Sequence, residues 1–196
     1  MKNLLFLTLP LLFASCLSPS TSPEPHYYQL QSKPDLGTSK KEFAIPYLIV
    51  GPVAVSPYLD RPQIVLRENE HQIKYLSNER WAEPLTVNIS TVVASNLRQH
   101  FDTTDISPGA PTLAINKEEN RVLILINRLD VDVDGNAYLD VQWGIVFPNP
   151  DKESIPHEGI YQTKITQDTM LDRVTALNDL IAEFSADLAK SIAEEM

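Results

Sequence analysis

Three aspartates alternate with valines in the segment Asp130-Val131-Asp132-Val133-Asp134-Gly135. Carboxylates at this spacing, followed by glycine, are typical of the start of an EF-hand calcium loop. The twelfth position of such a loop supplies a bidentate glutamate, but Val141 stands there in this chain. The flanking residues alternate with the period of strands rather than helices. We therefore expect the three carboxylates to line the solvent face of a β-hairpin, with weak incidental calcium binding as the alternative.

Covalent or hydrolytic catalysis has no recognisable motif in this sequence. The chain contains no Gly-x-Ser-x-Gly, no His-Glu-x-x-His and no phosphate-binding loop. Its histidines are far apart in the sequence, at His26, His71, His100 and His157. Because the members of a catalytic triad meet only in the folded protein, a hydrolase stays an alternative. The sequence favours a protein that is not an enzyme and uses no metal or dissociable cofactor.

Two polar segments with aromatic residues are candidates for a protein contact, since tyrosine, tryptophan and arginine are enriched at interfaces. The candidate partner-binding residues are Tyr58, Asp60, Arg61 and Gln63 in the first segment and Arg80, Trp81 and Glu83 in the second. Structural roles are the alternative: a turn closed by Asp60 and Arg61, an Arg80–Glu83 ion pair, and Trp81 in the core. We favour the core position for Trp81 and an exposed loop for Tyr58 and Arg61.

The N-terminal segment has the features of a lipoprotein signal peptide. Lys2 precedes an apolar run over residues 4–13, which is too short to cross a bilayer as a permanent helix. Small residues then precede Cys16, the single cysteine of the chain. The sequence therefore predicts a signal peptide over residues 1–15, cleavage before Cys16 and a lipid on that cysteine. A buried free thiol is the alternative.

The residues after the cysteine predict how the protein is attached and where it lies. Several acyl chains on Cys16 would hold the protein stably on a membrane. Leu17 rather than aspartate follows the cysteine, which favours the outer membrane, with the protein facing the periplasm. Residues 16–25 are rich in serine, threonine and proline and predict an extended tether. We expect the folded domain over residues 26–196.

Length, charge and hydrophobic periodicity indicate one α+β domain. The 196 residues carry a formal net charge of −10, which disfavours nucleic acid and anionic lipid surfaces as partners. Apolar stripes with helical spacing lie over residues 85–101 and 171–192, and alternating segments predict strands elsewhere. We expect a mainly antiparallel sheet with these two amphipathic helices packed on it. Residues 102–120 read as a long surface loop available to a partner.

Within the sheet, we expect one hairpin with its turn at residues 68–71 and a second with its turn at residues 134–136. In the second hairpin, the first strand is expected to turn one set of apolar side chains to the core. That set is Leu123, Leu125, Leu129, Val131 and Val133.

Several motifs together resemble a known family. They are Tyr27-Tyr28-x-Leu30, Val50-Gly51-Pro52-Val53, Pro57-x-Leu59-Asp60-Arg61-Pro62-Gln63-Ile64-Val65 and Arg80-Trp81-Ala82-Glu83-Pro84-Leu85. This combination resembles the PqiC-like auxiliary lipoproteins of ABC-type transport, and the likeness extends more loosely to Trp143 and the closing helix. Leu66 before Arg67 is a departure, because the family usually has a small residue there.

The resemblance implies a non-enzymatic subunit of a paraquat-inducible (Pqi-type) system that carries lipid between the inner and outer membranes. It implies docking to an MCE-domain, PqiB-like protein that spans the periplasm and forms the conduit. A homo-oligomer, with a ring as one form, would present matching surfaces to a symmetric partner. The main alternative is a lipoprotein that itself binds a lipid or other apolar ligand in a cavity between the sheet and the helices.

Overall fold

The computed structural model describes residues 23–33, 47–109 and 119–196. The expected signal peptide and Cys16 lie outside the described residues, as does most of the expected tether. The elements in chain order are β1 (His26–Tyr28), β2 (Leu48–Val55), β3 (Gln63–Asn69), β4 (Gln72–Trp81), α1 (Leu85–Phe101), β5 (Ile106–Pro108), β6 (Asn120–Asp132), β7 (Asn136–Val146), β8 (His157–Lys164) and α2 (Met170–Glu195).

In this part of the chain the strands form one eight-stranded sheet around β6. On one side, β6 pairs antiparallel with β7, which pairs antiparallel with β8. On its other side, β6 pairs with β2 and, near its end, with β3, and both run parallel to it. The α+β class is confirmed, and the β6–β7 and β7–β8 ladders are antiparallel as expected. The sheet as a whole is mixed, because β1 and β5 also pair in parallel with β4 and β2.

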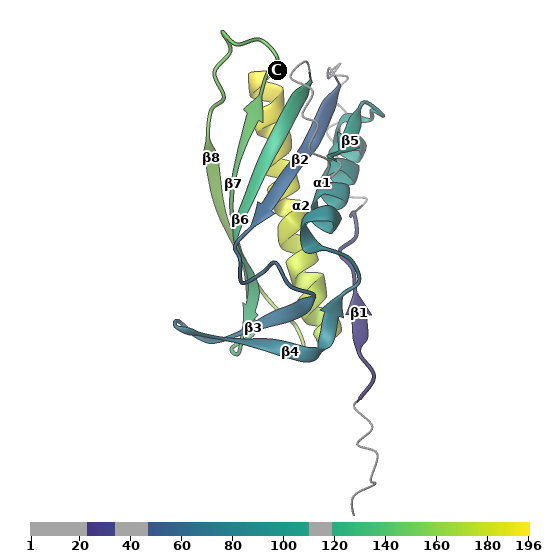
Figure 1. Ribbon diagram of the computed structural model, residues 1–196, viewed down its shortest axis with the longest axis vertical. Helices are drawn as coiled ribbons and strands as arrows, with labels where there is room; N and C mark the ends of the chain where they lie inside the picture. Colours follow the sequence, from purple (N-terminus) through teal and green to yellow (C-terminus); the bar gives the residue numbers. More distant parts are fainter. Residues whose placement is uncertain (1–22, 34–46, 110–118) are drawn as a thin grey trace, which may run out of the picture.

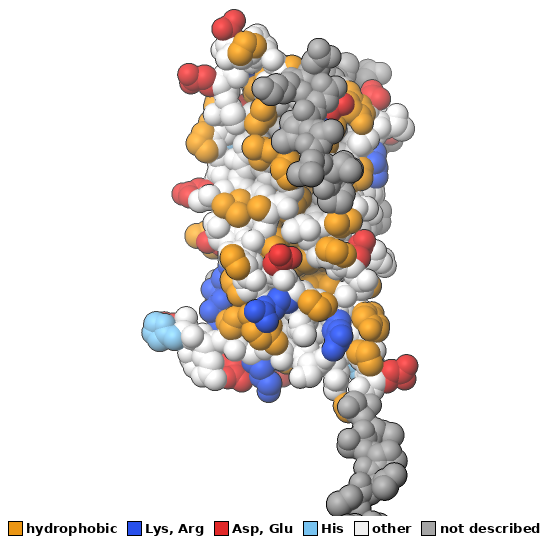
Figure 2. Space-filling model, viewed as in Figure 1, with side chains coloured by type: hydrophobic (Ala, Val, Ile, Leu, Met, Phe, Trp, Pro, Cys, Tyr) orange, Lys and Arg blue, Asp and Glu red, His pale blue; other side chains and the backbone are white. Residues whose placement is uncertain are grey.

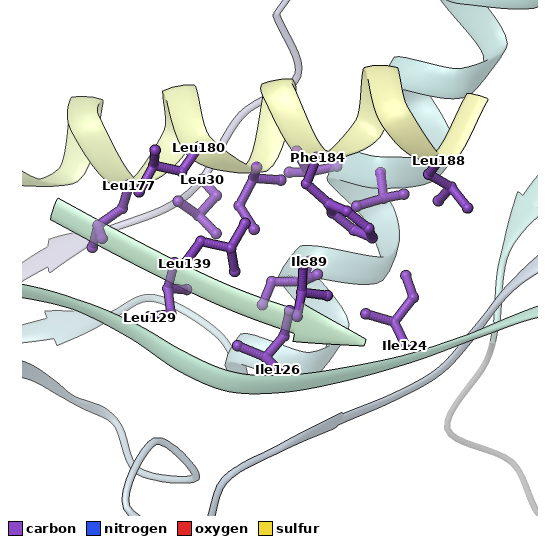
Figure 3. Close-up of a cluster of buried hydrophobic side chains, with 14 of the residues drawn as sticks. Leu30, Ile89, Ile124, Ile126, Leu129, Leu139, Leu177, Leu180, Phe184 and Leu188 are labelled. Carbon is purple, nitrogen blue, oxygen red and sulfur yellow. The ribbon is translucent and has the colours of Figure 1, made fainter. Parts of the chain in front are cut away.

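Both helices cover the same face of the sheet, with α2 running along most of its length (Figure 1). Pro84 stands at the N-cap position of α1, and the Thr169 side chain accepts a hydrogen bond from the Asp172 amide at the start of α2. The expected apolar stripes face the sheet, where Ile89, Leu139 and Phe184 are among the fully buried side chains (Figure 3). The two predicted helices are therefore confirmed, and so are their core-facing stripes apart from Leu171, which is exposed at the start of α2. Neither described helix combines the length and apolar content that crossing a bilayer requires.

The alternation expected along β6 is wrong in the first half of the strand. Val122, Ile124 and Ile126 are buried there, whereas Leu123 and Leu125 are 40% and 38% exposed. The register with β7 shifts between Ile126 and Arg128, so one extra residue of β6 lies in the ladder. Such a bulge reverses which face the following residues occupy, and Leu129 and Val131 are buried as expected. The expectation for Val133 is wrong, because it lies past the end of β6 and is exposed.

The expected loop over residues 102–120 is only partly a loop. Its first part forms β5, which pairs in parallel with the start of β2, and Ile106 is fully buried. The Arg98 side chain donates a hydrogen bond to the Ile106 carbonyl at 3.0 Å and helps to hold β5 beside α1. Residues 110–118 lie outside the described residues.

A short segment after β1, residues 29–33, crosses the two helices and is called the strap here. Asn88 of α1 binds the Leu30 backbone at both groups: its Oδ1 accepts from the amide at 2.7 Å and its Nδ2 donates to the carbonyl at 3.1 Å. Asn178 of α2 accepts from the Gln31 amide at 2.8 Å. Leu30 is 1% exposed, so these amides replace the water that its backbone loses on burial.

Candidate docking site

The strands β3 and β4 bring the two polar segments into contact. Gln63 lies opposite Arg80 in this antiparallel pair. The Trp81 amide donates to the Pro62 carbonyl at 2.7 Å, and the Ala82 amide donates to the Tyr28 carbonyl at 2.8 Å. Segments about twenty residues apart in sequence are thus fixed side by side by backbone hydrogen bonds, next to the first described strand.

Between them lies a hollow of about 310 Å³, called the motif pocket here. Its lining is Asp60, Arg61, Pro62, Trp81, Ala82, Glu83, Pro84 and Leu85. Four of the seven predicted partner-binding residues therefore line one surface feature. Asp60 and Arg61 are exposed at its rim, whereas Trp81 is only 7% exposed and packs in the core as favoured above.

Arg61 is the cation in the lining of the motif pocket and is held in place by its neighbours. Its guanidinium carbon lies 4.7 Å from the centre of the Tyr75 ring, which is a cation–π contact. Its amide donates to the Leu59 carbonyl at 2.8 Å in a tight turn, and Leu59 itself is buried. This arrangement presents a charged group to solvent in a restricted position, as an interface anchor requires.

Arg80 and Glu83 do not form the ion pair that was the structural alternative. The Arg80 Nε donates to the Ser77 carbonyl at 3.3 Å, within its own strand. Glu83 accepts a hydrogen bond at 2.7 Å from Gln29, next to β1. The carboxylate at the rim is therefore oriented by the N-terminal segment.

Tyr58 does not belong to the motif pocket, and the expectation that it is exposed on a loop is wrong. Its side chain is half-buried, and its hydroxyl donates to Asp130 Oδ2 at 3.2 Å. Burial, together with the negative charge of Asp130, raises the pKa of Tyr58 to about 12. The Tyr58 side chain therefore packs over β6.

Asp130 also differs from expectation, because it is fully buried rather than on the solvent face. Arg67 Nη2 lies 2.8 Å from one of its oxygens, and Arg128 Nε lies 2.9 Å from the other. The third aspartate of the motif, Asp134, is exposed in the expected hairpin turn, while Asp132 is half-buried and binds Asn136. In the described ranges, no group of three or more His, Cys, Asp or Glu side chains is placed to hold a metal ion.

A second hollow, of about 820 Å³, lies on the sheet face turned away from the helices and is called the outer groove here. Leu123 and Leu125 line it between two small residues, Ala54 on β2 and Gly144 on β7. Ser154 and Pro156 form its wall. Figure 2 shows apolar side chains spread over this face and Lys and Arg side chains mostly in its lower half.

Sequence reasoning missed the outer groove because the five consecutive apolar residues 122–126 have no alternation from which a face could be read. The small residues on the two neighbouring strands were the available signal, but their register with Leu123 and Leu125 appears only in the sheet.

Comparisons with known proteins agree with this fold. Protein XCC0632 from Xanthomonas campestris is 12% identical, with a TM-score of 0.66 over 83% of this chain and 92% of its own. The crystal structure of an uncharacterised protein is 20% identical, with a TM-score of 0.72 over 87% of this chain and 99% of its own. At these identities the similarity shows the fold alone. No curated protein matches the chain in sequence.

The model of one protein family, the ABC-type transport auxiliary lipoprotein component, matches residues 28–189. The matched range includes both segments of the motif pocket, the outer groove and most of α2. It covers well over half of the chain, and it agrees with the family resemblance expected from the motifs. The protein therefore belongs to the family of ABC-type transport auxiliary lipoprotein components.

Proposed function

We propose that the protein is a non-enzymatic accessory subunit of a Pqi-type, MCE-dependent system that moves lipid between the two membranes. In this proposal it is anchored to the outer membrane by a lipid on Cys16, faces the periplasm and needs no catalytic cofactor. The motif pocket docks to the MCE-domain, PqiB-like conduit protein. Copies assemble as a homo-oligomer, such as a ring, around that partner.

The observation that carries the proposal is the convergence of the two family-like segments into one surface feature with a positioned, exposed arginine. A residue needed only for folding would be expected in the core, as Trp81 is. Arg61 instead stacks on Tyr75 at the rim, where a rigid cation can pair with a carboxylate of a partner. The membership in a transport auxiliary family gives this surface a context.

The proposed anchor at Cys16 would limit how far the motif pocket can lie from the membrane. Tyr28 pairs with Trp81, so the first described strand borders the pocket. Cys16 is twelve residues before Tyr28, and an extended chain of that length reaches at most about 40 Å. A lipid on Cys16 would therefore hold the docking surface near the membrane.

The test is the affinity of the purified protein for its MCE-domain partner. We expect Arg61→Glu to weaken binding by at least about tenfold, since it reverses the charge at the rim. Lys190→Glu makes the same charge change on the exposed side of α2 and should leave binding unchanged. Equal affinities of Arg61→Glu and the wild type, with equal melting temperatures, would remove the motif pocket from the proposal.

A second candidate function, direct binding of an apolar ligand, is favoured by the outer groove. The space between sheet and helices, where such a cavity was expected, is filled by core side chains (Figure 3). The outer groove has the volume of a small-molecule site and exposes two leucines. Native mass spectrometry would detect co-purified lipid, and Leu125→Asp should abolish it. A protein that carries no lipid and takes up none from vesicles would exclude this function.

A further inference from the structure

The described part of the sheet ends in three strands that pair on one side only: β1, β5 and β8. Two of them are three residues long, and β5 ends at Pro108, whose nitrogen carries no hydrogen to donate. Short edge strands and prolines are common means of preventing further strand pairing. The third, β8, has eight residues and contains no proline.

The edge strand β8 is regular along its whole length. All eight residues, from His157 opposite Trp143 to Lys164 opposite Asn136, pair with β7 without a register shift. In the described residues no other segment pairs with the opposite side of β8. Figure 1 shows this strand at the border of the sheet. A continuous row of backbone donors and acceptors therefore faces outward.

The centre of β8 carries an apolar side chain where protected edges usually carry a charge. Ile160 is 79% exposed, more than any other large hydrophobic side chain described. Glu158 and Lys164 are exposed on the same face of the strand. Natural edges are commonly blunted by a central lysine or an inward-pointing charge, and here the charges lie towards the ends.

Contacts with α2 hold β8 in its extended form. The His157 ring nitrogen Nε2 lies 2.7 Å from Glu195 Oε1, and the Tyr161 hydroxyl donates to Asp187 Oδ2 at 3.0 Å. Tyr161 also covers Gly159, where an added Cβ would meet its hydroxyl oxygen at 2.7 Å. Because β8 is already ordered, only the added segment loses conformational entropy when the two strands pair.

We propose that β8 is a docking edge for an extended segment of another protein, which adds to the sheet as a further antiparallel strand. Main-chain hydrogen bonds supply the affinity in such β-augmentation, and alternate side chains supply the specificity. The charges of β8 define the ligand: a basic residue opposite Glu158, an apolar residue opposite Ile160 and an acidic residue opposite Lys164.

A second copy of this chain does not fit this edge when both copies are anchored in one membrane. Two β8 strands that meet in a twofold-symmetric pair run antiparallel, which inverts one molecule end over end. The strand runs along the long axis of the molecule (Figure 1), so the two tethers would leave from opposite ends. This step rests on the anchoring in the proposed function, whereas the open edge does not.

The test uses the purified full-length protein and a synthetic probe. The probe is a labelled peptide with the sequence of residues 157–164, in which isoleucine replaces the glutamine. When this peptide pairs antiparallel with β8, its lysine lies opposite Glu158 and its glutamate lies opposite Lys164. We expect it to bind and to slow hydrogen exchange of the β8 amides. Exchanging the glutamate and lysine of the peptide, or methylating its alternate amide nitrogens, should weaken binding by at least about tenfold.

Two variants locate the binding. Ile160→Lys places a charge at the centre of the edge and should lower the affinity for the peptide at least about tenfold. Leu171→Lys is the matched control, because Leu171 is also a large apolar residue, 70% exposed, and belongs to α2 rather than to β8. Arg61→Glu should leave peptide binding unchanged, which separates this proposal from docking at the motif pocket. Absent protection of the β8 amides would overturn it, and so would self-association of the protein anchored on vesicles that Ile160→Lys abolishes.

Discussion

Asp130 holds the outer face of β6 together, because two guanidinium groups and a phenol share its carboxylate. The carboxylate is fully buried, while the Arg67 and Arg128 side chains keep 20% and 30% of their surface exposed. The Arg128 guanidinium also stacks on the Tyr138 ring at 3.8 Å. Removing the shared anion would leave two positive charges facing each other in a partly desolvated space.

We expect Asp130→Asn to lower the free energy of unfolding by about 2–4 kcal/mol, since breaking a buried ion pair leaves the partner charges uncompensated. Urea denaturation followed by circular dichroism measures this loss. Asp134→Asn, at the exposed end of the same motif, should change stability by less than about 0.5 kcal/mol. Similar effects of the two substitutions would show that the cluster contributes little.

Tyr58 gives the protein a dependence on alkaline pH. Because its pKa is raised from 10.0 to about 12 in the folded state, the folded protein keeps a proton that the unfolded chain releases above pH 10. This contribution to stability is complete below pH 10 and is lost as the pH rises towards 12. We expect Tyr58→Phe to flatten the decline of unfolding free energy over that interval, and parallel curves would contradict the prediction.

At the scale of the elements, the strap depends on asparagine amides from both helices. We expect Asn88→Ala to cost about 2–3 kcal/mol, because it leaves the amide and carbonyl of buried Leu30 without their partners. Asn178→Ala removes a single bond at an exposed position and should cost less than about 1 kcal/mol. Limited proteolysis should cut near the strap faster in Asn88→Ala alone.

The elements themselves were largely predictable from local patterns. The stripes of α1 and α2, the hairpin turn at Gly135 and the core position of Trp81 follow from periodicity, turn chemistry and size. The parallel pairing of β2 and β3 with β6 was not predictable, because strand order is decided by packing between distant segments. The burial of Asp130 was not predictable for the same reason, because its partners Tyr58 and Arg67 come from another part of the chain. The extra residue in β6 appears only in the register with β7.

The candidate site was predictable in its residues but not in its geometry. Motif resemblance selected both segments of the motif pocket, although it could not separate exposed Arg61 from half-buried Tyr58. Both residues occur in one loop, and only the fold turns one side chain outward and the other over β6.

At the scale of the whole molecule, the proposed anchor decides where the protein acts. We expect Cys16→Ser to leave the protein without its lipid, so that it is lost from the outer-membrane fraction, whereas Ser20→Ala should have no effect. Fractionation of cell envelopes followed by immunoblotting measures both. Unchanged membrane association of Cys16→Ser would show that another part of the protein holds it there.

The parallel pairing of β1 with β4 has a mechanical consequence for a tethered protein. In the anchored protein proposed above, a pull along the axis of β1 would load its hydrogen bonds to β4 in shear, so that they share the force. The strap extends this load path through Asn88 and Asn178 into both helices. Tension between a membrane and a bound partner would therefore be carried by the body of the domain rather than by the peeling of one strand.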